Sequence, residues 1–125
     1  MVKKQKYIYE AKVLSIHDGD TISVEIDLGF QMRFTDKIRF YGVNAPELKI
    51  RNENKKLVSN PQGQITLQAI QSLIKVGDII IIETIKDNKE KYGRYLANIY
   101  VTDKDKQIFV NQYLLDNELA VPMKY

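Results

Sequence analysis

Residues 21–28 alternate strictly between apolar and polar side chains, a pattern typical of a strand with one buried face. The preceding residues 7–16 are rich in Tyr, Ile and Val, and residues 32–40 continue an apolar pattern beyond a turn at Gly29. Because such short connections join antiparallel neighbours, this part of the chain predicts a three-stranded meander. The buried face of the middle strand is expected to consist of Ile22, Val24, Ile26 and Leu28.

The pattern changes after the third predicted strand. Residues 48–59 are polar, basic and aperiodic, which predicts a mobile loop. Asn60 and Pro61 then supply an N-cap and a proline for the first helical position, and Gly77 stands where a helix C-terminal glycine is expected. Between them the apolar residues fall at helical spacing, at Ile65, Ala69, Ile70, Leu73 and Ile74.

The rest of the chain predicts two strands, over residues 78–85 and 92–101, and a short helix from Val110 to about Asn117. The fold class is therefore α+β, mainly β, with the order β-β-β-α-β-β-α. A five-stranded OB-fold barrel has this order, with one helix between strands 3 and 4 and a short C-terminal helix, although other folds share it. Since no linker or internal repeat divides the chain, we expect a single domain over residues 1–125.

The amino-acid composition excludes several classes of function. The absence of Cys excludes a disulfide scaffold, a thiolate zinc site and a cysteine nucleophile. The longest aliphatic run, residues 79–82, is far too short to span a membrane, so no membrane partner is expected. Residues 1–6 are basic, but residues 7–12 carry charge where a signal peptide is apolar. We therefore expect no export signal here, and leave open a cytoplasmic protein or a secreted one whose signal was removed.

The net charge of +3 is unevenly distributed. Residues 48–60 carry four cations against Glu53 alone, and residues 86–94 carry four cations against two acids. Such clusters are typical of surfaces that contact phosphates, although lysines in a loop are often merely solvated. The cations of the first cluster are Lys49, Arg51, Lys55 and Lys56.

Three short segments hold the candidate chemistry: residues 17–21, 39–47 and 91–94. In the first, Asp18-Gly19-Asp20 is by itself an ordinary hairpin turn. Alternatively, Asp20 offers its carboxylate to a hard cation.

The second and third segments contribute Arg39 and Arg94, two of only 4 Arg in a chain with 15 Lys. A chain that uses Lys so strongly is expected to use Arg where its planar fork matters. Pro46 fixes the backbone before Glu47, which suits a carboxylate held in one position. Taken one at a time, Arg39 also fits a surface ion pair, Glu47 a solvated acid, and residues 91–94 a hairpin tip. Together they suit phosphodiester hydrolysis: a cation and two arginines stabilise the developing charge, and a carboxylate accepts a proton from water.

These segments closely resemble the staphylococcal nuclease family. The resemblance rests on Asp18-Gly19-Asp20-Thr21, then Arg39 with Pro46-Glu47, then Lys91-Tyr92-Gly93-Arg94, in order and at matching intervals. It extends over about residues 8–122. It implies an OB-fold barrel that uses Ca²⁺ to cleave DNA and RNA and leaves 3′-phosphates. The implied partners are DNA or RNA, preferably single-stranded, and the implied state is a monomer.

The resemblance also implies a role for each matching residue. Asp20 resembles the calcium carboxylate, and Asp18 resembles an acid that lies near the metal without binding it. The family's second calcium aspartate falls at Asn44, and the next ligand, a backbone carbonyl, falls at Ala45. Fewer anionic ligands should weaken Ca²⁺ binding. Arg39 and Arg94 resemble the phosphate-binding arginines, and Glu47 resembles the general base. Lys91 and Tyr92 resemble the residues that hold a terminal phosphate.

Two other functions stay open at this point. A non-catalytic OB module could bind nucleic acid or protein, but relatives of that kind typically lack the Arg39, Glu47 and Arg94 set that is complete here. A structural or interaction protein would require three ordered motifs to match by accident. The sequence therefore favours a calcium-dependent nuclease.

Overall fold

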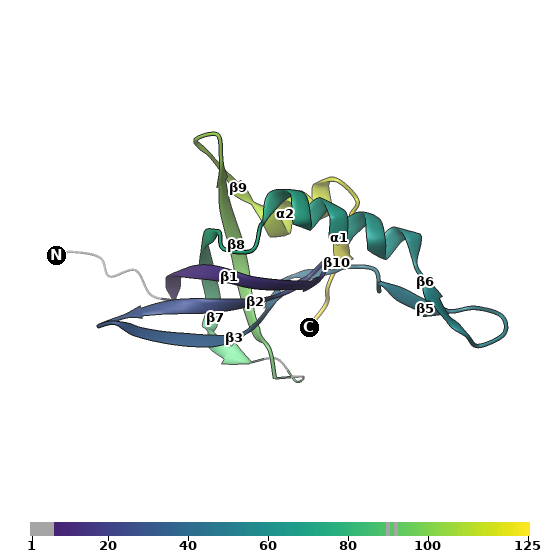
Figure 1. The fold of residues 1–125 in the computed structure, drawn as a ribbon, viewed down its shortest axis with the longest axis horizontal. Helices are drawn as coiled ribbons and strands as arrows, with labels where there is room; N and C mark the ends of the chain where they lie inside the picture. Colours follow the sequence, from purple (N-terminus) through teal and green to yellow (C-terminus); the bar gives the residue numbers. More distant parts are fainter. Residues whose placement is uncertain (1–6, 90, 92) are drawn as a thin grey trace.

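The structure is a computed structural model that describes residues 7–89, 91 and 93–125. Its centre is a barrel of five long strands (Figure 1). The pattern of apolar residues predicted all five, although β7 is longer and β8 begins later than expected. The strands are β1 (Ile8–Asp18), β2 (Thr21–Gly29), β3 (Met32–Phe40), β7 (Ile79–Lys89) and β8 (Tyr95–Asp103).

The strands follow the order β3-β2-β1-β7-β8, and all neighbours in this order are antiparallel. A parallel pairing between β3 and β8, with Arg39 opposite Leu96, closes the sheet into a barrel. The closed five-stranded barrel with two helices confirms the predicted α+β, OB-type fold class. A sixth strand that the sequence pattern did not predict, β9 (Lys106–Phe109), extends the sheet from β8.

The first helix, α1 (Pro61–Leu73), begins where Asn60 and Pro61 predicted. It ends four residues before Gly77, so the predicted C-terminal end was wrong. Ile74 has extended backbone angles and is fully buried, because the chain turns inward here to place its side chain in the core. Gly77 instead serves the turn into β7, with φ of +94° and its N–H donating to the Val13 carbonyl at 2.8 Å.

Residues 48–59 are not the mobile loop that was predicted. They form a two-stranded hairpin, β5 (Lys49–Arg51) and β6 (Leu57–Ser59), which projects beyond the N-terminal end of α1 (Figure 1). The side chain of Asn52 orders the tip, since its Oδ1 accepts the N–H groups of Asn54 at 2.9 Å and Lys56 at 3.0 Å. The sequence pattern did not predict this hairpin, because the segment is polar and its strands have no buried face.

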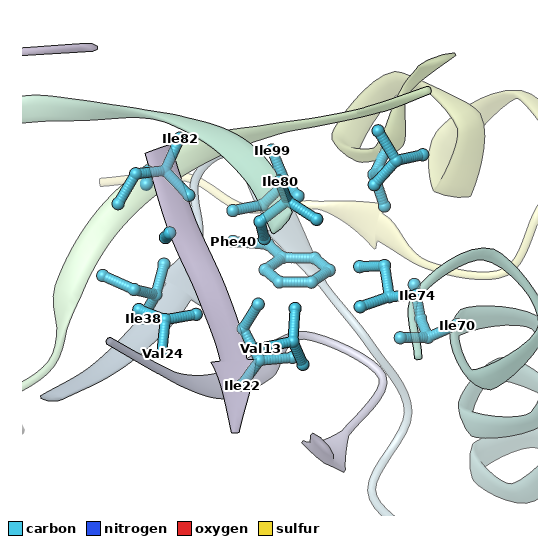
Figure 2. Packing of buried hydrophobic residues seen from close by; sticks show 14 of the residues in the cluster. Val13, Ile22, Val24, Ile38, Phe40, Ile70, Ile74, Ile80, Ile82 and Ile99 are labelled. Carbon is cyan, nitrogen blue, oxygen red and sulfur yellow. The ribbon is translucent and has the colours of Figure 1, made fainter. Parts of the chain in front are cut away.

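The core fills the barrel and extends under α1. Figure 2 shows the Phe40 ring between side chains from β1, β2 and β7 and the side chain of Ile74, which follows α1. Leu28, predicted on the buried face of β2, is 43% exposed because it lies next to the β2–β3 turn, beyond the barrel wall. Within the described residues, neither helix is long and apolar enough to cross a membrane. The labelled core residues around Phe40 are Val13, Ile22, Val24, Ile38, Ile70, Ile74, Ile80, Ile82 and Ile99.

The second helix, α2 (Val110–Asp116), closes the other side of the core and places a buried polar side chain against the barrel. Asn111 Oδ1 accepts the Ile99 N–H at 2.8 Å, and its Nδ2 donates to the carbonyls of Tyr41 at 2.8 Å and Ala97 at 3.2 Å. One amide thus ties α2 to β8 and to the turn after β3. This turn leads into the segment that carries Asn44 and Glu47.

Asn111→Ala is expected to lower the free energy of unfolding by about 2–4 kcal/mol, because two buried backbone groups and one part-buried carbonyl lose a partner. Urea denaturation measures the change. Gln112→Ala, at the neighbouring exposed position of α2, is the control and should change it by less than about 0.5 kcal/mol. Equal effects of the two substitutions would contradict a structural role for the buried amide.

Candidate active site

A cleft of about 780 Å³ opens beside the end of the barrel where β1 passes into β2. It gathers every sequence-predicted site residue that the structure describes, from segments far apart in the chain. Tyr92 lies outside the described residues. The predicted residues that line the cleft are Asp18, Asp20, Arg39, Asn44, Ala45, Glu47, Lys91 and Arg94.

The acidic wall of the cleft is the tight turn between β1 and β2. Asp18 Oδ1 accepts the backbone N–H of Asp20 at 3.0 Å, so one acid fixes the backbone of the other. The residue between them is Gly19, and helix α1 packs directly against the turn at this position. A Cβ atom at Gly19 would lie 2.5 Å from the Cγ2 atom of Thr66.

Asp20 and Arg39 form a buried ion pair, with about 7% and 9% of their side chains exposed. The second partner of Asp20 Oδ2 is the Ala45 N–H, at 2.8 Å. Arg39 Nη2 donates to the Val43 carbonyl at 3.2 Å and to Asn44 Oδ1 at 3.1 Å. These bonds draw the short strand β4 (Val43–Asn44) against the acidic turn.

The pKa values of Asp18 and Asp20 shift in opposite directions. Burial by itself would raise the pKa of Asp20, but hydrogen bonds from Arg39, Asp18 and the Ala45 N–H outweigh burial and lower it. The pKa of Asp18 is raised, mainly by burial and then by its hydrogen bond to Asp20. Asp20 is therefore the carboxylate that keeps its negative charge most firmly.

Arg94 reaches the same face of the barrel as Arg39. Its Nη1 donates to Thr21 Oγ1 at 3.3 Å, and the Thr21 hydroxyl donates to Asp20 Oδ1 at 3.1 Å. In the sheet, Thr21 is the neighbour of Arg39 on β2. The chain of contacts therefore connects both arginines to one carboxylate.

Glu47 lies on the segment between β4 and the β5–β6 hairpin, and its side chain is exposed at the cleft. Its backbone is held from behind by the start of α1. Asn60 Nδ2 donates to the Glu47 carbonyl at 2.8 Å, and the Asn60 N–H donates to the Leu48 carbonyl at 2.8 Å. The carboxylate is thus free to meet a ligand while its backbone is fixed.

A pair of tyrosines stands at the C-terminal side of the cleft, and one of them, Tyr125, lines it. Tyr41 and Tyr125 stack with ring centroids 5.1 Å apart and nearly parallel planes. The Gly42 N–H donates to the Tyr125 hydroxyl at 2.9 Å. The strand β10 (Val121–Pro122) pairs with β4 and brings this part of the chain to the cleft. The sequence motifs assigned no site role to either tyrosine, because the pairing joins residues about 80 positions apart.

The donor atoms of the cleft suit a hard cation. Asp18, Asp20 and Asn44 provide oxygen only, the donor type that Ca²⁺ takes. Among the described residues no group of three or more His, Cys, Asp or Glu side chains is placed to hold a metal. The two carboxyl groups and the amide are hard oxygen ligands with a low total anionic charge, and Asp20 and Asn44 also accept bonds from Arg39. The soft and imidazole ligands typical of zinc are missing from this set.

Comparison with known proteins shows the family to which the chain belongs. Residues 37–125 match the family model described as staphylococcal nuclease homologue, and the chain belongs to this family. An uncharacterized protein of Methanocaldococcus jannaschii is 30% identical over 120 residues, covering 86% of this chain and 56% of that protein. The endonuclease YncB of Bacillus subtilis is 31% identical over 105 residues, covering 84% of this chain and 46% of that protein. The chain thus spans about half the length of the curated relatives it matches.

Arg39→Met is expected to lower the free energy of unfolding by about 3–5 kcal/mol, because it leaves the Asp20 carboxylate buried without its partner. Urea denaturation at neutral pH in the presence of a chelator measures this loss. Adding Asp20→Asn to the same chain should recover a large part of it. Arg33→Met removes the exposed Arg33–Asp27 pair and is the control, with an expected loss below about 1 kcal/mol. A loss no larger than that of the control would contradict the buried pair.

Proposed function

We propose that this protein is a calcium-dependent nuclease. It hydrolyses phosphodiester bonds of DNA or RNA with little sequence specificity and leaves 3′-phosphates. The observation that supports this most strongly is that two guanidinium groups, the Asp18–Asp20 turn and the exposed Glu47 line one cleft. Membership of the staphylococcal nuclease homologue family and a relative named as an endonuclease support the same activity.

In this proposal Arg39 and Arg94 bind the oxygens of the scissile phosphate. Attack on a phosphodiester increases negative charge on these oxygens, and fixed guanidinium groups stabilise that charge more strongly than bulk water does. Their planar forks can each contact two oxygens, which a lysine ammonium does with less directional control. Because the arginines contact phosphate and not base edges, we expect little sequence specificity.

Glu47 is proposed as the general base. It accepts a proton from a water molecule as the water oxygen forms a bond to phosphorus. The bond from phosphorus to the 5′-oxygen breaks, and that oxygen takes a proton from solvent. The phosphate then remains on the 3′-oxygen of the other product. Glu47 suits this task because its side chain is exposed while its backbone is held in place.

Asp20, the Asn44 amide oxygen and the Ala45 carbonyl are proposed to hold Ca²⁺, with Asp18 beside them. The ion would supply positive charge next to the reacting phosphate. Asn44 is neutral where the family has an aspartate, so we expect weak calcium binding. The exposed Lys91, together with Tyr92, is proposed to hold a terminal phosphate of a bound strand.

A single strand is flexible and bends into a cleft more easily than a stiff duplex, so single-stranded DNA or RNA is the preferred substrate in this proposal. We further propose that the activity resides in one domain over residues 1–125 that acts as a monomer.

Glu47→Gln is expected to lower kcat on denatured DNA by about 10²–10⁴-fold at saturating Ca²⁺, because the amide cannot accept the proton of the attacking water. The release of acid-soluble nucleotides measures the rate, and end-group analysis of the products identifies 3′-phosphates. The wild-type rate should vanish in chelator and return when Ca²⁺ is added. Binding of DNA without any cleavage by the wild-type chain would replace this proposal with the non-catalytic binding module. A wild-type rate in Glu47→Gln would remove Glu47 from the mechanism.

The β5–β6 hairpin generates a second prediction about the substrate. Lys49, Arg51, Lys55 and Lys56 are all exposed there, and none forms an ion pair within the part of the chain that the structure describes. Removing these four charges together should raise KM and reduce the salt dependence of binding, with little change in kcat. Each lost phosphate contact lowers the log–log salt slope by about 0.7 for single strands. Removing Lys104 and Lys106, exposed around the β8–β9 turn, is the control. An unchanged slope in the hairpin variant would show that these cations do not contact the substrate.

A further inference from the structure

The first turn of α1 touches the backbone that carries Glu47 more closely than packing alone requires. Two consecutive carbonyls of that segment are bonded to it. Asn60 donates from its side chain to the Glu47 carbonyl at 2.8 Å and from its backbone to the Leu48 carbonyl at 2.8 Å. Gln64 Nε2 also donates to the Leu48 carbonyl, at 3.3 Å.

Asn60 makes these bonds in place of its usual task. An asparagine at an N-cap normally accepts a backbone N–H from the first helical turn with its side-chain oxygen. Here Asn60 is the N-cap of α1, yet its side chain forms no capping hydrogen bond. Its amide points away from the helix to hold the Glu47 carbonyl.

Gly63, one turn into the helix, brings the two backbones together. A Cβ atom at this position would lie 2.1 Å from the Glu47 carbonyl oxygen and 2.7 Å from its carbonyl carbon. The obstacle would be backbone, which cannot rotate away as a side chain does. Gly63 has helical geometry and lies inside α1, where alanine would otherwise be the better helix former. The close approach to Glu47 is therefore the physical reason for a glycine at this position.

The same side of α1 also supports the acidic turn. Thr66, one turn further along, packs against Gly19 between Asp18 and Asp20, and its hydroxyl donates to the Leu119 carbonyl at 2.6 Å. The helix is thus in contact with both segments that bring carboxylates to the cleft. The distance from Glu47 to the acidic turn depends on how closely α1 approaches each of them.

We infer that Gly63 and Asn60 are positioning residues: they set the place of Glu47 relative to the acidic turn through its main-chain carbonyl, without touching the substrate. This inference rests on the proposed function, in which Glu47 acts on the attacking water. Neither residue belongs to the motifs that resemble the nuclease family in the sequence. Their effect should fall on the chemical step and not on substrate binding.

Gly63→Ala is the principal test, with kcat and KM on denatured DNA measured at saturating Ca²⁺. The added methyl group must push Glu47 away from the helix, and a displacement of about 1 Å at a reacting group can lower the rate about 10²-fold. We expect kcat to fall about 10–100-fold and KM to change less than about twofold. Gln62→Ala, on the exposed side of the same helical turn, is the matched control and should retain the wild-type rate.

A double-mutant cycle with Glu47→Gln separates positioning from general damage. If Gly63 acts through Glu47, then Gly63→Ala should cause little further loss of kcat in the Glu47→Gln chain. An equal loss in both backgrounds would overturn the inference and leave the proposed nuclease function intact. Absence of cleavage by the wild-type chain would instead refute the proposed function itself.

Asn60→Ser provides a second route if Gly63→Ala fails to fold. Serine is an equally good N-cap, but its shorter side chain lacks the amide donor that reaches the Glu47 carbonyl. We expect a decrease in kcat of several-fold with unchanged KM and an unchanged midpoint of thermal unfolding. A wild-type kcat in Asn60→Ser, or a loss confined to thermal stability, would overturn the role of Asn60.

Discussion

The parallel pairing of β3 with β8 is the contact on which the rest of the molecule depends. It closes the barrel, and by doing so it encloses the aliphatic core around Phe40. It also brings Arg94, which directly precedes β8, to the same side of the barrel as Arg39 near the end of β3. Antiparallel hairpins could form β1 to β3 locally, but only closure places the two arginines at one cleft.

Burial of charge is the second constraint. Arg39 alternates with the core residues of β3, and the acidic turn and the segment after β3 cover its side chain, so its guanidinium group requires an internal partner. Asp20 supplies it, and the Ala45 N–H and Thr21 hydroxyl occupy further positions on the same carboxylate. The segment after β3 is consequently fixed by the acid that is proposed to bind the metal. Structural stability and the proposed chemistry therefore share the same side chains.

Helix α1 links the core to the cleft. Its apolar side contributes Ile70 to the interior, while its first turns press against the Asp18–Asp20 turn and the backbone of Glu47. Gly19 and Gly63 allow these approaches because neither has a Cβ atom. A helix whose amphipathic pattern indicates only core packing thus also fixes the separation between two acid-bearing segments.

The sequence by itself determined the five long strands, both helices and the identity of the charged residues, because alternation, helical spacing and short motifs are local properties. The start of α1 was correct for this reason, since Pro61 at the first helical position acts on its own neighbours, although the Asn60 side chain bonds to the Glu47 carbonyl and does not cap the helix. Tertiary structure decided the end of α1 at Leu73, the β5–β6 hairpin and the Tyr41–Tyr125 stack. It also decided that Gly63 must be a glycine. The hairpin pairs locally, but its strands have no buried face to mark them. The other features depend on contacts between residues distant in the chain, and such contacts leave no periodic signal in the sequence.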